Sequence, residues 1–357
     1  MMVSCSSRTR HALCGYVAGA GTCALVASLW YARQRLKRFG ESRSPKEAVE
    51  EACYVPAAIS RYRREAAVAV ELARECGRAM LAAASSAKSV EWKGAGILDP
   101  CTATDRDNET AVCHRLAREF PDHAVIGEEA AAAAGCVPAA DPRIPTWIVD
   151  PVDGTQNFFH DLPLACVSIG LSFGGKPVLG VVYDPYRDET YVAVDGCGAF
   201  VNGERLAAAG AGQLHEPRTL SESLVLTDPG YERSPRGVAR LAKLHERLLS
   251  ARTRAIRIVG SSVLAVLLVA GGRASAFVVG VGDGGDSPKP WDFCAASVFA
   301  AETGCVLEAL DGRVHPPAPP SPPPRDAGGA FDVRAMSCVC ARTRGLADEV
   351  KKIVAAL

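Results

Sequence analysis

The stretch that decides the fold is WIVDPVDGTQNF, residues 147–158. A short apolar run leads into Asp150, a proline stiffens the turn, and Asp153 follows just before a Gly-Thr pair. Carboxylates gathered at the end of a buried strand are costly unless a cation holds them. Gly154 and Thr155 place backbone N–H groups where a helix can begin, which favours a phosphate there. The stretch therefore indicates a strand end that holds a metal ion and a phosphate.

A second acidic group lies upstream in IGEE, residues 126–129, and it also follows a short apolar run. Hard divalent ions take oxygen ligands, and the near-octahedral shell of Mg²⁺ is commonly filled by carboxylates, water and a substrate phosphate. The Val152 carbonyl is available as a further oxygen ligand. No histidine joins these residues, which argues against zinc. A DxxDGT turn alone would be ordinary turn chemistry. Together with IGEE and a late Trp-Asp pair, it predicts a magnesium site.

Three segments resemble the signature segments of the inositol monophosphatase family. They are GEE, WIVDPVDGTQNF and KPWDFCAA, the last at residues 289–296. The similarity runs from about Arg64 to the C-terminus and includes TATD, GVVYDP, GAFVNG, IRIVGS and VLLVAGG. The resemblance implies an α+β fold, a layered α/β/α/β/α sandwich of the inositol monophosphatase and fructose-1,6-bisphosphatase type.

The resemblance also implies the roles of individual residues. The implied metal ligands are Glu128, Asp150, the carbonyl of Val152, Asp153 and Asp292. The implied catalytic residues, which would orient the attacking water, are Glu128, Thr155 and Asp105. The implied substrate-binding residues are Val152, Asp153, Gly154, Thr155, Gly260, Ser261, Ser262 and Asp292.

The expected activity is that of a Mg²⁺-dependent phosphomonoesterase, a phosphoric monoester hydrolase that uses metal-activated water. The expected substrate is a small polyol or sugar phosphate, inositol monophosphate first. A 3′(2′),5′-bisphosphate nucleotidase, a histidinol-phosphatase and a fructose-bisphosphatase-like activity remain alternatives, because the acidic residue usual in the strand before Trp291 falls at Val278. The non-enzyme alternative is a membrane-tethered pseudophosphatase scaffold. It is disfavoured because all the implied carboxylates are present.

Composition limits the remaining classes. The chain has 357 residues, 48% of them hydrophobic, which is ordinary globular composition. Lys plus Arg (40) equals Asp plus Glu (40), so the chain has no net positive charge that would attract nucleic acid. Nucleic acid is therefore not expected as a partner. The 14 cysteines show no zinc-binding spacing and are typical of a reducing compartment. The expected partner beyond the small phosphorylated metabolite is a second copy of the chain, since the family is usually homodimeric.

The N-terminus carries an uncharged apolar run at residues 13–32, long enough at ~1.5 Å per residue to cross a ~30 Å hydrocarbon layer. Basic residues on its C-terminal side would leave the catalytic part on the cytoplasmic side of a membrane. The alternatives are a transit peptide for a plastid or mitochondrion, removed on import, and a secretory signal. The expected division is 1–55 as anchor or transit segment and linker, 56–205 with the first metal motifs, and 206–357 with the Trp-Asp motif and a Pro-rich loop.

Periodicity predicts the main elements. Residues 64–84 carry Val68, Leu72, Cys76 and Met80 at helical spacing. A second helix is expected to start at Asp105 or Asp107, capped by Thr104 or Asp105. Short β-like runs from residue 123 to 194 predict a meander, and strands alternating with helices after residue 206 predict βαβ units. The Pro-rich run at 315–331 is interpreted as a surface insertion.

Overall fold

The computed structural model describes residues 54–84, 88–93, 98–138, 140–210, 217, 219–285, 287–311 and 332–357. The chain divides into residues 1–51 and one compact unit, Ala52–Leu357, and the fold below is that of the second unit. Within the described ranges, no helix combines the length and the apolar character needed to cross a membrane. The predicted apolar segment at 13–32 and the Pro-rich run at 315–331 lie outside these ranges.

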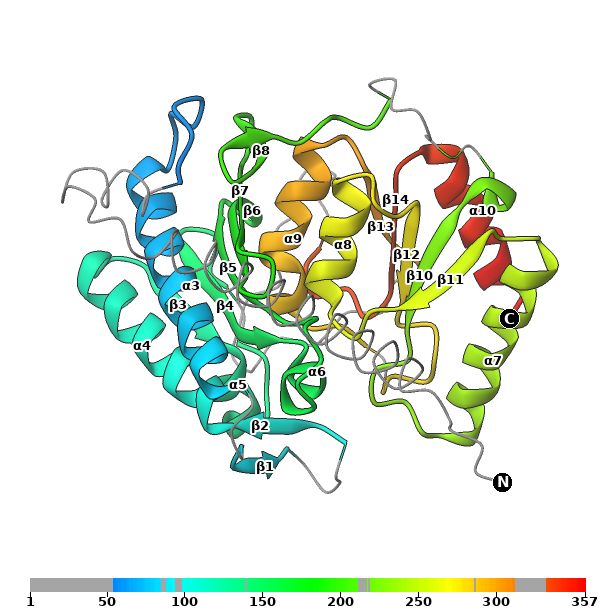
Figure 1. Cartoon of the computed structure of the whole chain (residues 1–357), viewed down its shortest axis with the longest axis horizontal. Coiled ribbons are helices and arrows are strands. Elements are labelled where there is room, and N and C mark those ends of the chain that lie inside the picture. Colours follow the sequence, from blue (N-terminus) through cyan, green and yellow to red (C-terminus); the bar gives the residue numbers. More distant parts are fainter. Residues whose placement is uncertain are drawn as a thin grey trace, which may run out of the picture. The chain divides into compact units, whose positions relative to one another are not determined.

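The unit is built of five alternating layers of helices and sheets (Figure 1). The first sheet has seven strands in the order β3-β4-β5-β6-β7-β8-β9. Only its first pair is parallel, and the other strands form an antiparallel meander, as predicted. The strands are β3 (Ala124–Gly127), β4 (Thr146–Asp153), β5 (Cys166–Phe173), β6 (Lys176–Asp184), β7 (Glu189–Val194), β8 (Gly198–Val201) and β9 (Glu204–Arg205).

The second sheet has five strands in the order β11-β10-β12-β14-β13. Strand β10 is parallel to both of its neighbours, and the chain passes between these parallel strands through helices α7 (Pro235–Ser250) and α8 (Ser262–Ala270), which confirms the predicted βαβ units. Strand β14 is antiparallel to both of its neighbours. The strands are β10 (Leu224–Asp228), β11 (Ala255–Ile258), β12 (Ala276–Val279), β13 (Val306–Ala309) and β14 (Cys338–Ala341).

Three helix layers separate and cover the sheets (Figure 1). Helices α3 and α4 pack on one face of the first sheet, α8 and α9 lie between the sheets, and α7 and α10 cover the second sheet. This arrangement confirms the expected α/β/α/β/α sandwich. The remaining elements are α3 (Arg63–Ala83), β1 (Val90–Trp92), β2 (Pro100–Thr102), α4 (Ala103–Glu119), α5 (Glu128–Ala134), α6 (Thr155–Phe159), η1 (Leu220–Glu222), α9 (Pro290–Glu302) and α10 (Arg344–Ala355).

The first two helices test the predicted boundaries. Helix α3 buries Val68, Leu72, Cys76 and Met80, as the spacing predicts. The expected start of the second helix was wrong: α4 begins at Ala103, and its N-cap is Thr102. The side chain of the third helical residue, Asp105, accepts the backbone N–H of Thr102 at 2.9 Å, so the two residues form a capping box.

Helix α9 approaches the first sheet closely because two glycines leave room for it. Gly170 and Gly180 are cross-strand partners on β5 and β6. A Cβ atom on Gly170 would lie 2.5 Å from the Cys294 sulfur, and one on Gly180 would lie 2.4 Å from the Ala295 carbonyl oxygen. The glycine pair therefore sets the distance between α9 and the sheet.

The sequence analysis expects a domain boundary between residues 205 and 206. This position lies after β9, the last strand of the first sheet, and before the second sheet. That it separates two domains stays a prediction.

Candidate active site

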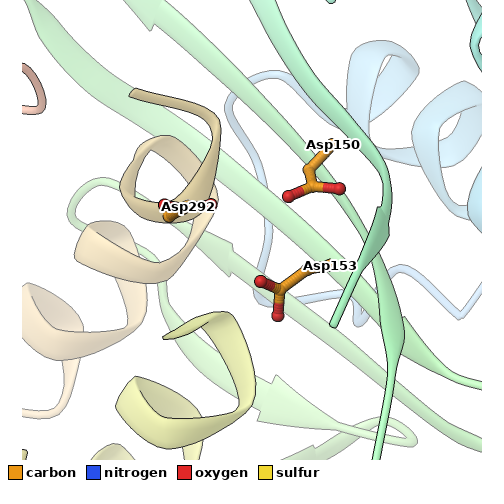
Figure 2. Close-up of side chains that lie close together, drawn as sticks. All are labelled: Asp150, Asp153 and Asp292. Atoms are coloured by element: carbon orange, nitrogen blue, oxygen red, sulfur yellow. The ribbon is translucent and has the colours of Figure 1, made fainter. Parts of the chain in front are cut away.

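An irregularity in β4 brings Asp150 and Asp153 to one side of the sheet. Residues three apart on a regular strand point to opposite faces. Asp150 pairs with Ser168 and Asp153 with Cys166, so three steps along β4 oppose two along β5, and the register shifts between them. The break contains a proline, which cannot donate a ladder hydrogen bond. This bulge lets both carboxylates point into the same space (Figure 2).

The third carboxylate comes from the other end of the chain. Asp292 lies in the first turn of α9, the helix seated on the glycine pair, and its carboxylate accepts the backbone N–H of Lys289 at 2.7 Å. One carboxylate oxygen from each of Asp150, Asp153 and Asp292 lies within 4.8 Å of the other two. Figure 2 shows these three side chains facing a common space from β4 and α9.

The acidic trio Asp150, Asp153 and Asp292 is electrostatically unfavourable without a cation. Burial raises the pKa of Asp150, and the neighbouring carboxylates of Glu128, Asp153 and Asp292 raise it further. Burial raises the pKa of Asp153 to about 7, although the Ser261 hydroxyl donates a hydrogen bond to it. Burial and the charge of Asp153 also raise the pKa of Asp292. Each carboxylate therefore resists ionisation as long as the others are charged.

The donor set of the trio fits a hard divalent cation. All three ligands offer carboxylate oxygens, and Asp150 and Asp153 are only 2% and 6% exposed. A divalent cation at this point would compensate the buried charge that raises all three pKa values. Oxygen donors without sulfur or imidazole are the set that Mg²⁺ and related ions prefer.

Glu128, the fourth predicted carboxylate, lies beside the trio at the start of α5. It hydrogen-bonds to Asp150 and forms an ion pair with the Lys93 ammonium at 2.7 Å. Lys93 also pairs with Glu129 at 2.7 Å, and these two acidic groups raise the pKa of Lys93 although burial opposes the rise. The position of Glu128 depends on Glu109, a buried residue that sequence reasoning missed. The Glu109 carboxylate accepts the N–H groups of Glu129 and Ala130 at 2.7 and 2.8 Å.

Thr155 and Asp105 form a buried pair next to the bulge. The Thr155 hydroxyl lies 3.2 Å from an Asp105 carboxylate oxygen and 2.9 Å from the carbonyl oxygen of Val152. The other Asp105 oxygen accepts both the backbone N–H and the hydroxyl of Thr102. Burial raises the pKa of Asp105 to about 6, because desolvation outweighs these hydrogen bonds. The capping box of α4 thus fixes the carboxylate that faces Thr155.

The loops at Gly154 and Gly260 pack against each other. Gly154 has a φ of 88°, and a Cβ there would lie 2.8 Å from the Leu164 carbonyl oxygen. The Asn157 amide donates to the carbonyls of Leu164 and Val259, each at 2.8 Å. These contacts fix the turn that leads from β4 into α6 against the turn that leads from β11 into α8.

The Ser261 side chain links α8 to the acidic trio. Its hydroxyl donates to Asp153 and accepts the backbone N–H of Leu264 at 3.1 Å. The Val263 N–H donates to the same Asp153 oxygen at 3.2 Å. The start of α8 therefore holds Asp153 in place.

A cavity of 1060 Å³ joins these groups. Every predicted site residue except Asp105 lines it; Asp105 lies beneath Thr155 with no exposed surface. The expectation for Val278 was wrong. This side chain is 1% exposed and packs in the cluster with Val225 and Val339, whereas its neighbour Val279 lines the cavity. The alternation of side chains along β12 explains the difference, and the residue that faces the cavity is still apolar.

An acidic trio suited to a divalent cation, next to a buried Thr–Asp pair, is typical of a metal-dependent phosphoryl hydrolase. Comparisons with known proteins agree. Residues 62–356 match the model of the inositol monophosphatase family. Inositol monophosphatase 1 of Solanum lycopersicum is 38% identical over 67% of this chain and 82% of its own length, and the human inositol monophosphatase 1 is 32% identical over 80% and 91%.

The solved structures give the same result. The IMPase of Thermotoga maritima superimposes with a TM-score of 0.63 at 28% identity, over 82% of this chain and 97% of its own. The chain belongs to the inositol monophosphatase family, whose members depend on metal ions. It is therefore a phosphoric monoester hydrolase.

Proposed function

We propose that the chain is a Mg²⁺-dependent phosphatase that hydrolyses a small polyol or sugar phosphate, with inositol monophosphate as the first candidate. The observation that carries this proposal is the convergence of Asp150, Asp153 and Asp292 within 4.8 Å. Family membership supports the phosphatase class, and the oxygen-only ligand set supports magnesium as the ion. Glu128 and the carbonyl of Val152 would complete the ligand set.

The phosphate would lie against the turn after the bulge. Gly154 and Thr155 line the cavity next to the trio, and Gly154 has no side chain to keep a phosphate away from the backbone. Gly260 and Ser262, on the facing turn, line the same cavity and would contact the alcohol part of the ester. Ser261 would act through Asp153, because its hydroxyl is already engaged there.

The attacking water would be oriented by Thr155, Asp105 and Glu128. When bound, divalent cations lower the pKa of water and neutralise charge on the phosphate ester. The Thr155 hydroxyl would donate its proton to Asp105, and its oxygen would then accept a hydrogen bond from the attacking water. Glu128 would accept the proton of the water, since it lies in the cavity beside Asp150.

The test measures phosphate release from inositol monophosphates, fructose-1,6-bisphosphate, histidinol phosphate and a 3′,5′-bisphosphonucleotide, with and without Mg²⁺. Wild type is compared with Asp153→Asn, and calorimetry measures Mg²⁺ binding to both. We expect magnesium-dependent turnover that Asp153→Asn abolishes together with tight binding of the ion. A folded wild type that binds Mg²⁺ and cleaves none of these esters would contradict the proposal.

Two further expectations stay predictions. A homodimer would be detected by sedimentation of the full chain. The membrane, plastid or mitochondrial location depends on residues 13–32, and a fluorescent fusion with and without these residues would test it.

A further inference from the structure

One wall of the cavity is formed by residues outside the sequence motifs that predict the metal and phosphate sites. Gly230 and Tyr231, from the loop between β10 and α7, line it together with Gly284 and Gly285 from the segment 280–285 after β12. None of these residues belongs to the proposed metal or phosphate site. A volume of 1060 Å³ lies just above the ~300–1,000 Å³ range of sites for whole small molecules, so the alcohol part of the ester also has room in the cavity.

One buried carboxylate joins the two segments of this wall. Glu232 is 4% exposed, and it accepts the N–H of Ser234 at 2.7 Å within its own loop. It also accepts the N–H groups of Asp283 and Gly285, at 2.6 and 3.3 Å, from the other segment. Burial alone would raise the pKa of Glu232, but these donors lower it to about 2. The carboxylate is therefore charged at any pH at which the enzyme would work, and charge-assisted hydrogen bonds are the strong ones.

Steric contacts also show that Glu232 lies at the junction of the two segments. A Cβ on Gly285 would lie 2.7 Å from the Glu232 Cα atom, and a Cβ on Gly237 would lie 2.2 Å from its carboxylate carbon. The 280–285 segment and the first turn of α7 thus pack directly on Glu232. The neighbouring Tyr231 donates its own N–H to the Gly285 carbonyl at 2.8 Å. The two segments are therefore joined by hydrogen bonds donated from both sides.

Tyr231 presents an aromatic ring and a polar tip to the cavity. Tyr231 is 38% exposed. It hydrogen-bonds to Asp99, which directly precedes β2 and also lines the cavity. Tyrosine combines an apolar ring face with a hydroxyl group. A cyclic polyol or sugar has the complementary surface, with C–H faces for the ring and hydroxyls for the polar groups.

We propose that Glu232 is a positioning residue that fixes the 280–285 segment and Tyr231 as one wall of the substrate site, and that this wall selects the leaving alcohol. This proposal rests on the phosphatase function above. Tyr231 contacts the ring of a cyclic ester, and Glu232 acts through Tyr231 and the segment without touching substrate. The wall makes a cyclic polyol or sugar phosphate the preferred substrate class over an acyclic one.

The test uses the full chain with Mg²⁺ and two substrates, the cyclic ester that wild type cleaves best and the acyclic glycerol 2-phosphate. The variants are Tyr231→Ala and Glu232→Gln, and the matched control is Glu246→Gln on the exposed face of α7. We expect both variants to raise KM roughly tenfold for the cyclic ester with kcat within about twofold, and to leave KM for glycerol 2-phosphate within about twofold. The control should leave KM and kcat unchanged for both substrates.

The outcomes separate the two proposals. If wild type cleaves no phosphate ester, the phosphatase proposal fails and the wall with it. If wild type is active and both variants change KM equally for the two substrates, only the wall proposal is overturned. The same holds if neither variant changes KM for either substrate. If Glu232→Gln does not fold, Tyr231→Ala decides alone, because its side chain is partly exposed and its removal leaves the Glu232 hydrogen bonds intact.

Discussion

The Thr155 hydroxyl and the buried carboxylate of Asp105 lie 3.2 Å apart, although they come from α6 and α4, fifty residues apart in the chain. Asp105 has no exposed surface, and its second oxygen is held by Thr102. A carboxylate fixed in this way can hold the threonine hydroxyl in a single orientation. In the proposed mechanism the ionised Asp105 carboxylate orients the Thr155 hydroxyl for the attacking water.

Asp105→Asn should lower kcat by about 10²–10³-fold, because the amide cannot fix the Thr155 hydroxyl in the same way. Calorimetric Mg²⁺ affinity should change little, since Asp105 lies outside the acidic trio. Burial raises the pKa of Asp105 to about 6, so wild-type kcat should fall as the pH drops through about 6. Unchanged kcat in the variant at neutral pH would show that the pair has no catalytic role.

Mg²⁺ should stabilise the protein more as the pH rises. The folded-state pKa of Asp153 is about 7, above its ordinary 3.8. The stability that protonated Asp153 contributes to the metal-free protein is therefore fully present below pH 3.8 and is lost as the pH rises through about 7. The ion binds the charged form. Thermal unfolding should therefore show a Tm gain from Mg²⁺ of roughly 5 °C at about pH 8 and much less at about pH 5. Asp153→Asn is the control and should show a small gain at both pH values; an equal gain at both values in wild type would contradict the prediction.

Gly180→Ala should destabilise the protein by about 2 kcal/mol, because the new methyl group would press on α9 at the Ala295 carbonyl. Since α9 carries Asp292, Mg²⁺ affinity should fall as well. The control is Gly174→Asn in the turn of the same hairpin, where φ is 65° and a Cβ would meet nothing within 4 Å. Asparagine tolerates that conformation. Chemical denaturation and calorimetry measure both effects; equal Mg²⁺ affinity in Gly180→Ala and wild type would show that α9 does not set the position of Asp292.

Glu109→Ala should remove two buried hydrogen bonds at the start of α5 and cost about 1–2 kcal/mol of unfolding free energy. The activity should fall further than stability explains, because the start of α5 also positions Glu128. Glu119→Ala is the control, because Glu119 lies on the same helix α4 and its carboxylate pairs with Arg115. Full kcat in Glu109→Ala at a temperature where it is folded would exclude a positioning role.

Much of the fold followed from local patterns. The helical spacing in α3 and the short β-like runs of the first sheet predicted the right elements, because each reflects which face of one element is buried. The alternation of strands and helices after residue 206 also predicted the second sheet correctly. The expected start of α4 was wrong because Thr102, Thr104 and Asp105 are all residue types that suit an N-cap, so the local pattern does not distinguish them. Thr102 is the cap, and Asp105 closes its capping box.

The sequence by itself determined the residue types of the site: carboxylates at strand ends and helix starts, a Gly-Thr turn between them, and the family to which they belong. Only the tertiary structure decided which of these groups meet. The bulge in β4 brings Asp150 and Asp153 to one side, and the glycine pair beneath α9 brings Asp292 to them. Glu109 and Glu232 were not predicted, because their partners are backbone N–H groups of segments distant in the chain. Such contacts depend on how whole layers pack, and no local pattern of residue types records that packing.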